Sequence, residues 1–274
     1  FIIWSGDPYG GMVLMLSIGL LTVLLSIYFG SKMFGETTGL LIGLLVAISP
    51  AVVSQSRFIW PPFPVSLLTV FFLYFIFKVF QRNQAYLPLG AFVLGLMGHF
   101  ELATSGTFFT QFLLFLPVLL LRKFVSLKYA FLSLASFALA LSPLVAFNFR
   151  HDNIIVQGIL NLSKSEAEHQ IFSTYFKQII LNHLEVFKFN FLSVFPQNQL
   201  LWPVILGLMA LGTFLYLKDN RLKPENKWFV AYLVTNPLAL FGVFMFYLSP
   251  MWEWWILQLI ILYIFAFGIM STYL

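Results

Sequence analysis

The chain has 274 residues, of which 60% are hydrophobic and only 9% are charged, and its mean hydropathy is +0.91. Soluble globular domains carry about 25% charged residues, so this composition predicts an all-α polytopic membrane protein without a nucleic-acid partner. The net charge of +5 fits that class, because basic residues of membrane proteins cluster in cytoplasmic loops. Cysteine is absent, which excludes disulfides, thiol catalysis and thiolate metal sites.

Apolar segments of spanning length recur along the chain. A membrane-spanning helix needs roughly 20 mainly apolar residues, and eight or nine segments are predicted, near residues 11–30, 38–55, 63–80, 86–100, 104–121, 127–147, 200–217, 228–248 and 252–274. The short link Gly98-His99-Phe100-Glu101 indicates a tight hairpin or broken helices. Because no soluble domain and no convincing repeat is evident, we expect one transmembrane helical bundle over residues 1–274.

The only long segment between spans covers residues 148–199 and is expected on the outer face. Apolar residues recur in it at helical spacing, at Ile171, Phe172, Tyr175, Phe176, Ile179, Ile180 and Leu184. This pattern is typical of a helix that lies in the membrane interface with its apolar face down. A helix packed on neighbouring spans would show the same pattern.

Charge alternates from one connection to the next. If residues 1–10 lie outside, the cytoplasmic loops hold 10 of the 15 basic residues, namely Lys32, Lys78, Arg82, Arg122, Lys123, Lys128, Lys218, Arg221, Lys223 and Lys227. The positive-inside rule requires such an excess. All four histidines and seven of the ten acidic residues then lie outside, so we expect the chemistry of this protein on the outer face.

Ser-Pro pairs mark three expected outer helix ends, at Ser49-Pro50, Ser142-Pro143 and Ser249-Pro250. Proline removes a backbone donor and kinks or ends a helix, and serine hydroxyls can satisfy the freed carbonyl. An arginine follows the first two prolines by seven residues, at Arg57 and Arg150. Either the broken ends form a cavity into which both arginines point, or the helices end there and the arginines extend to the interface.

Arg57 lies in an aromatic, Pro-rich stretch, residues 54–64, that contains Trp60 and no acid. His99 and Glu101 lie between two apolar segments, and intramembrane ionisable residues are functional hypotheses by default. A hydrogen-bonded structural pair is the alternative for these two residues. Trp60 and His99 are expected to line the outer cavity.

Arg150-His151-Asp152 is the densest polar triplet of the chain. The planar guanidinium of arginine suits phosphate or carboxylate, and an imidazole beside an acid can move protons. The alternative is a solvated turn in which Arg150 pairs with a local acid.

Two further acids are candidates. Asp7 precedes the first span, although Asp-Pro is also an ordinary turn signal. Glu253 lies in Trp252-Glu253-Trp254-Trp255, a cluster typical of the aromatic belt of membrane proteins, where it can line a lipid-facing opening. The sequence contains no HExxH motif and no Gly-rich phosphate loop between a strand and a helix, so we predict neither a metal site nor nucleotide chemistry.

A run of short motifs resembles a known family. It comprises Gly6-Asp7-Pro8-Tyr9, Lys32-Met33-Phe34-Gly35, Ser49-Pro50 and Ser56-Arg57-Phe58. Over residues 5–150 the chain is similar to the core of the GT-C membrane glycosyltransferases, and more narrowly to bacterial relatives of dolichyl-phosphate-mannose protein mannosyltransferases and of the lipid A aminoarabinose transferase.

The resemblance implies transfer of a sugar from a polyprenyl-phosphate carrier to an acceptor at the extracytoplasmic face of the bacterial plasma membrane. Family members use an acid in the first outer loop to activate the acceptor and basic residues to hold the carrier phosphate. Because the chain begins with Phe1 rather than Met, we expect a fragment whose main catalytic acid precedes Phe1. Many relatives also carry an acid shortly after the arginine matching Arg57, where this chain has Ile59-Trp60-Pro61-Pro62.

The site hypothesis combines these residues. Arg57 and Arg150 are expected to bind the carrier phosphate, because arginine suits a phosphate that leaves with developing charge. Catalytic roles are assigned to Glu101, Asp152 and Asp7, and cavity-lining roles to His99, His151, Trp60 and Glu253. The expected partners are the lipid-linked donor and membrane lipids, with no protein-bound cofactor; the acceptor and any divalent ion stay open.

Two other functions are compatible with the sequence. A transporter or flippase would place its site near the membrane midplane on paired broken helices, often with inverted repeats, whereas here the polar groups gather on one face. A non-catalytic assembly partner is the third hypothesis. It gains weight if the complete protein has no acid in its first outer loop.

Overall fold

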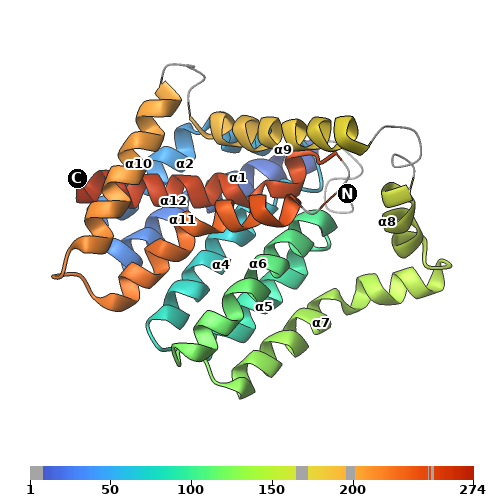
Figure 1. The fold of residues 1–274 in the computed structure, drawn as a ribbon, viewed down its shortest axis with the longest axis horizontal. Coiled ribbons are helices and arrows are strands. Elements are labelled where there is room, and N and C mark those ends of the chain that lie inside the picture. Colours follow the sequence, from blue (N-terminus) through green and yellow to red (C-terminus); the bar gives the residue numbers. More distant parts are fainter. Residues whose placement is uncertain (1–8, 165–171, 196–200, 246, 248–249) are drawn as a thin grey trace.

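The computed structural model describes residues 9–164, 172–195, 201–245, 247 and 250–274, and within them the chain is helical without strands (Figure 1). This confirms the all-α class. The helices are α1 (Tyr9–Phe34), α2 (Glu36–Ile48), α3 (Pro50–Arg57), α4 (Val65–Phe80), α5 (Tyr86–Met97), α6 (Leu102–Leu121), α7 (Leu127–Arg150), α8 (Ile154–Lys164), α9 (Phe172–Val194), α10 (Leu201–Lys218), α11 (Pro224–Phe244), the 3₁₀ turn η1 (Glu253–Ile256) and α12 (Gln258–Tyr273).

Five of the described helices, α1, α6, α7, α10 and α11, are long and apolar enough to cross a membrane, and α2 with α3 makes a sixth if the pair counts as one bent span. The helices α4, α5 and α12 are apolar but shorter. These helices indicate an integral membrane protein. The expected number of eight or nine spans is not confirmed, because only five or six of the described helices have spanning length.

The helix end predicted at Ser49-Pro50, within the apolar segment 38–55, is confirmed, because the chain breaks at Ser49. Ser49 is extended, Pro50 opens α3, and the two helices are bent by 59°. Proline cannot donate the backbone hydrogen bond that would continue α2. Close packing holds α2 against α1, since a Cβ atom at Gly39 would overlap the backbone of Ser31.

The second expected helix end is wrong, because α7 continues through Ser142-Pro143 to Arg150. Pro143 leaves the carbonyl of Leu139 without its helical donor, and the Ser142 hydroxyl donates to that same carbonyl at 2.8 Å. The serine thus compensates for the proline and the helix persists. Ser249 of the third pair lies outside the described residues.

The predicted break between the fourth and fifth apolar segments is confirmed, since α5 ends at Met97 and α6 begins at Leu102. Glu101 caps α6 by accepting a hydrogen bond from the amide of Ala103 at 3.3 Å. Tight packing accompanies this turn, because a Cβ atom at Gly95 of α5 would lie 2.6 Å from the Cβ of Ala140 on α7.

A helix is confirmed in the long segment 148–199, where α9 packs against α3, η1, α11 and α12. Ile179, His183 and Asn190 are buried there. In Figure 1, α9 and α12 run nearly parallel, and the rings of Phe191 and Tyr263 lie 5.1 Å apart. Among the predicted apolar positions, Ile179 is buried and Leu184 is exposed, so packing on neighbouring helices accounts for part of the apolar spacing of α9 in the described residues.

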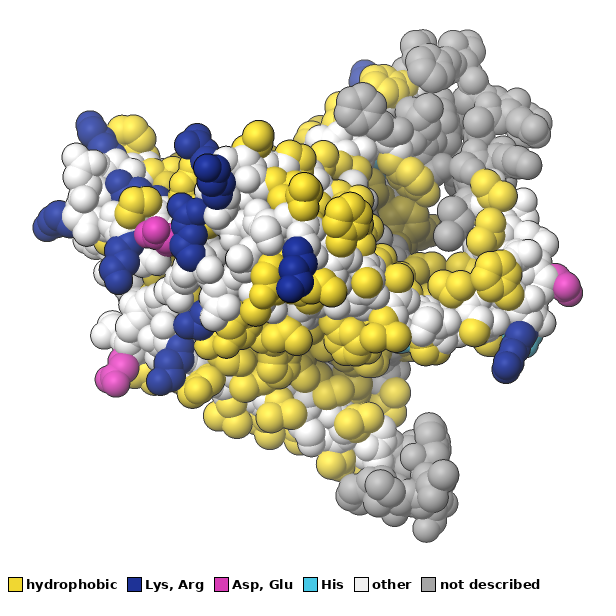
Figure 2. All heavy atoms as spheres, turned by 90° about the horizontal axis from the view of Figure 1, so that it is seen from below, with side chains coloured by type: hydrophobic (Ala, Val, Ile, Leu, Met, Phe, Trp, Pro, Cys, Tyr) yellow, Lys and Arg dark blue, Asp and Glu magenta, His cyan; other side chains and the backbone are white. Residues whose placement is uncertain are grey.

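The short basic connections meet at one end of the bundle. Arg82 donates to the carbonyls of Arg122 and Lys123 at 2.9 and 2.8 Å, and the Arg122 guanidinium lies 5.0 Å from the ring centroid of Trp228. Figure 2 shows Lys and Arg side chains concentrated at this end, with hydrophobic side chains across the middle of the molecule. The predicted sorting of charge between the two ends is therefore present in the fold.

A few polar side chains are buried inside the apolar bundle. Gln111 of α6 donates to the carbonyl of Asn236 of α11 at 2.8 Å, and Gln258 of α12 donates to the Thr107 hydroxyl at 3.3 Å. Gln111, Asn236 and Gln258 are fully buried. Hydrogen bonds of this kind link helices inside a membrane, where the polar groups cannot reach water.

Candidate functional site

A cavity of about 610 Å³ opens between α3, the 58–63 connection, α9 and η1, at the end opposite the basic connections. We call it the aromatic cavity. It is lined by Pro50, Ala51, Ser54, Gln55, Phe58, Ile59, Trp60, Phe63, Phe189, Asn190, Ser193, Glu253, Trp254, Leu257 and Ile260. The structure therefore places Trp60 and Glu253, both predicted cavity-lining residues, in one cavity.

The η1 turn owes its position to hydrogen bonds from two helices. On the α6 side, the Thr104 and Thr107 hydroxyls donate to the carbonyls of Trp254 and Trp255 at 2.7 and 3.2 Å. On the α9 side, the Asn190 amide donates to the carbonyl of Ile256 at 3.3 Å. Because the backbone of η1 is held from both sides, the side chains of Glu253 and Trp254 keep a defined position in the cavity lining.

Tryptophan rings form one wall of the cavity. The centroids of Trp60 and Trp254 lie 5.4 Å apart, and Phe63 lies 5.5 Å from Trp60. Trp252 stacks on Trp254 at 5.2 Å with nearly parallel planes. Such contacts between rings orient large apolar faces, so the cavity offers flat surfaces beside the carboxylate of Glu253.

The α3 wall is fixed by a buried hydrogen bond. The Ser66 hydroxyl donates to the Gln55 side-chain oxygen at 2.6 Å. Arg57 lies in the last turn of α3, next to the lining residue Phe58, and is exposed. Arg57 is not itself a lining residue, and it forms no ion pair with a described acid.

A neighbouring pocket of about 330 Å³ shares Phe189, Glu253 and Trp254 with the aromatic cavity. Its lining also includes Asn182 and Glu185 of α9, and the Asn182 side chain accepts from the amide of Met251 at 2.9 Å. Glu185 was not predicted as a site residue. The sequence could have indicated Glu185, because it is one of the polar residues that alternate with the apolar residues of α9.

His99 and Glu101 do not line the aromatic cavity. His99 donates from Nε2 to the carbonyl of Ala140 at 2.7 Å, which links the α5–α6 turn to α7. Glu101 caps α6 and is half-buried. Burial raises the pKa of the Glu101 carboxyl, and the hydrogen bond from Ala103 partly opposes that rise. Each residue thus makes a structural hydrogen bond, but neither bond joins His99 to Glu101, so the expected hydrogen-bonded pair is not seen in the described residues.

Arg150, His151 and Asp152 lie at the end of α7, which packs mainly against α5 and precedes α8. His151 donates from Nδ1 to the carbonyl of Phe147 at 2.8 Å and stacks on its ring at 4.0 Å. Asp152 adopts a left-handed conformation with φ 52°, which aspartate tolerates better than most residues. None of these three residues lines the aromatic cavity.

Asp7, the remaining predicted catalytic residue, lies outside the described residues. Among the residues that the structure places, no group of three or more histidine, aspartate or glutamate side chains is arranged to hold a metal ion.

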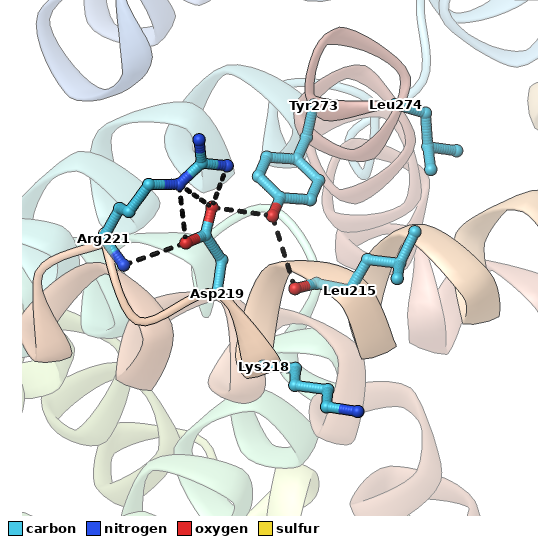
Figure 3. Close-up of a pocket in the computed structure, with 6 residues that line it drawn as sticks. All are labelled: Leu215, Lys218, Asp219, Arg221, Tyr273 and Leu274. Atoms are coloured by element: carbon cyan, nitrogen blue, oxygen red, sulfur yellow. Dashed lines mark hydrogen bonds and ion pairs between the residues drawn. The ribbon is translucent and has the colours of Figure 1, made fainter.

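In a pocket of about 390 Å³ at the basic end, polar side chains of the lining hydrogen-bond to one another (Figure 3). Arg221 donates to both carboxylate oxygens of Asp219, and the Tyr273 hydroxyl donates to Asp219 at 2.9 Å. These hydrogen bonds, chiefly those from Arg221, hold the pKa of Asp219 well below its usual range. The cluster ties the α10–α11 connection to the end of α12, which is a structural role.

Comparisons with known proteins find no relative of this chain. No family model matches the chain, and neither a search of curated proteins nor a search of solved structures finds a match.

Proposed function

We propose that this protein is a membrane glycosyltransferase that moves a sugar from a polyprenyl-phosphate carrier to an acceptor at the extracytoplasmic face of a bacterial plasma membrane. The observation that carries the proposal is the aromatic cavity. It combines aromatic walls, the buried amides of Gln55 and Asn190, serine hydroxyls and one carboxylate, at the end of the bundle remote from the basic connections.

The chemistry of a sugar fits these walls. The apolar faces of a sugar ring pack on aromatic rings, and its hydroxyl groups pair with the side chains of Ser54, Asn190 and Ser193 that line the cavity. Pockets that bind small ligands show this combination of apolar walls and a few polar groups, at volumes of about 300–1,000 Å³. The aromatic cavity falls within that range.

The transfer step follows from the charged groups. Glu253 is the described acid that lines the aromatic cavity, and it accepts the proton of the acceptor hydroxyl. That hydroxyl attacks the anomeric carbon, and the bond between this carbon and the phosphate oxygen breaks. The polyprenyl phosphate leaves with added negative charge, which Arg57, the neighbour of the lining residue Phe58, stabilises.

Glu253→Gln tests the proposal in membranes that contain the full-length protein. Transfer from a labelled polyprenyl-phosphate sugar should fall about 10²–10⁴-fold, since general-base assistance contributes that much to catalysis. Glu36→Gln is the matched control, because Glu36 is an exposed acid in the first turn of α2, at the basic end.

Two results would contradict the proposal. Transfer by Glu253→Gln at the wild-type rate removes the assigned base. Accumulation of the labelled substrate inside vesicles without any covalent product identifies a transporter instead.

A further inference from the structure

A second cavity, of about 650 Å³, lies on the other side of α9. We call it the apolar cavity. It is lined by residues of α9, α10, α11 and α12, namely Leu184, Phe187, Lys188, Phe191, Leu192, Trp202, Leu206, Met209, Ala210, Leu233, Val234, Pro237, Leu238, Phe241, Tyr263 and Ala266. The two cavities share no lining residue.

Small side chains and a proline create this space. Ala210 of α10 and Ala266 of α12 leave room where larger side chains would fill the gap between the helices. Pro237 lies inside α11 and cannot donate to the carbonyl of Leu233, one turn earlier. Both Pro237 and Leu233 line the cavity, so the missing helical hydrogen bond of α11 lies beside it.

The cavity lies at the level of the membrane and is open to the side. Its walls α10 and α11 both qualify as membrane spans. Two of its lining residues, Leu206 and Leu238, are 41% and 69% exposed. In a bilayer these exposed leucines contact hydrocarbon, so the occupant of the cavity comes from the lipid phase.

Lys188 is the one charged residue of the lining and is exposed. It forms no ion pair with any acid in the described part of the chain, and Glu185, one turn away, lines the pocket on the other side of α9. A lysine beside an apolar cavity keeps its stem on apolar surface and its ammonium at the polar interface. Lys188 therefore attracts an anionic group that sits at the same level.

The direction of α9 sets how such a molecule would lie. Asn190 contacts the carbonyl of Ile256, just before α12 begins, whereas Phe191 meets the ring of Tyr263 and Phe195 that of Phe267. The chain after Lys188 thus descends along α12. The α9 part of the lining extends from Leu184 to Leu192, and Lys188 lies between apolar residues within it.

We propose that the apolar cavity binds an acyl chain of an anionic glycerophospholipid whose phosphate pairs with the Lys188 ammonium. The occupant is anionic because the only charge of the lining is positive, and it is a lipid because the opening faces the bilayer. This site is separate from the aromatic cavity and does not depend on the function proposed for it.

The test uses the full chain, purified in mild detergent, delipidated, and titrated with phosphatidylglycerol or phosphatidylcholine of identical acyl chains. Bound lipid is counted by native mass spectrometry. We expect the wild type to bind phosphatidylglycerol about fivefold more tightly, the effect of one interfacial lysine on an anionic lipid. Lys188→Gln should lose that preference, whereas Lys177→Gln, an exposed lysine of the same helix outside the lining, should keep it.

A second experiment fills the cavity with a larger side chain. Ala266→Phe should lose both lipids, because the ring occupies the space of the acyl chain. In the unaltered chain, phosphatidylglycerol with brominated acyl chains should quench a part of the tryptophan fluorescence that is missing in Trp202→Phe, a substitution that keeps an aromatic ring in the lining and adds no volume.

Several results would overturn the proposal. They are equal binding of the two lipids by the wild type, an unchanged preference in Lys188→Gln, wild-type binding by Ala266→Phe, and quenching that is the same in Trp202→Phe. Displacement of phosphatidylglycerol by undecaprenyl phosphate at equal concentration would assign the cavity to a prenyl chain instead.

Discussion

Helix α9 separates two cavities whose linings differ in chemistry although the same helix forms a wall of each. Toward η1 it presents Asn190 and Ser193, and the opposite wall adds the carboxylate of Glu253. Toward α10 and α11 it presents Phe187, Phe191 and other apolar side chains. A polar and aromatic cavity suits a sugar, whereas an apolar one suits a hydrocarbon chain.

The two cavities also differ in how they are held open. Hydrogen bonds from Thr104, Thr107 and Asn190 fix the backbone of η1 beside the aromatic cavity. The apolar cavity depends on the short side chains of Ala210 and Ala266. The comparison shows that single hydrogen bonds control the first cavity and side-chain volume controls the second, so different substitutions should disturb each.

The largest expected effect, after loss of the Glu253 carboxylate, comes from Arg57. Arg57→Gln should lower sugar transfer about 10²-fold, because one preorganised donor to a developing negative charge contributes at least that factor. Binding of phosphatidylglycerol should not change. A transfer rate within twofold of wild type in this variant would separate Arg57 from the reaction.

A matched pair of tryptophan substitutions sharpens the contrast. Trp60→Ala removes one aromatic face of the aromatic cavity and should raise the KM for the lipid-linked sugar about five- to tenfold, the range of a lost aromatic contact. Trp202→Ala removes the same side chain from the apolar cavity. It should weaken lipid binding and leave the KM unchanged; equal KM effects of the two variants would contradict separate sites.

Thr104→Val should loosen η1 by removing the hydroxyl that donates to Trp254. We expect a loss of about 1 kcal/mol in the free energy of unfolding, typical of one hydrogen bond, measured from denaturant unfolding in detergent micelles. Thr110→Val is the control, because the Thr110 hydroxyl bonds only to Gly106 of its own helix. Equal losses in both variants would show that the link to η1 contributes nothing.

The smallest expected effect concerns pH. Burial raises the pKa of Glu101 in the folded protein above the ordinary value of 4.5, so the folded state binds the proton more tightly than the unfolded state. The free energy of unfolding should therefore fall as pH rises from about 4.5 through the raised pKa. Glu101→Gln should remove this slope. An unchanged pH profile in that variant would assign the slope to another group.

Composition and apolar spacing predict much of the fold. Segments rich in leucine and phenylalanine predict the helices, and the basic residues predict which connections lie at the same end. The sequence does not predict the outcome of each Ser-Pro pair. Pro50 ends α2, yet Ser142 compensates for Pro143 and α7 continues, because the result depends on whether a hydroxyl reaches the freed carbonyl.

The site is predicted only in part. The tryptophans of residues 252–255 and the stretch around Trp60 stand out as aromatic clusters, but their pairing across 5.4 Å comes from tertiary packing of residues far apart in the chain. Arg150 has the same spacing from a proline as Arg57, yet it ends a long helix on another part of the bundle. The apolar cavity has no local signal, because absent volume at Ala210 and Ala266 is visible only after the helices pack.

The most direct measurement compares Glu253→Gln and Ala266→Phe in two assays on the same preparations: transfer from a labelled polyprenyl-phosphate sugar, and retention of phosphatidylglycerol. The account predicts that Glu253→Gln loses transfer and retains the lipid, whereas Ala266→Phe loses the lipid and still transfers sugar. Wild-type transfer by Glu253→Gln, or a parallel loss of both activities in both variants, would contradict it.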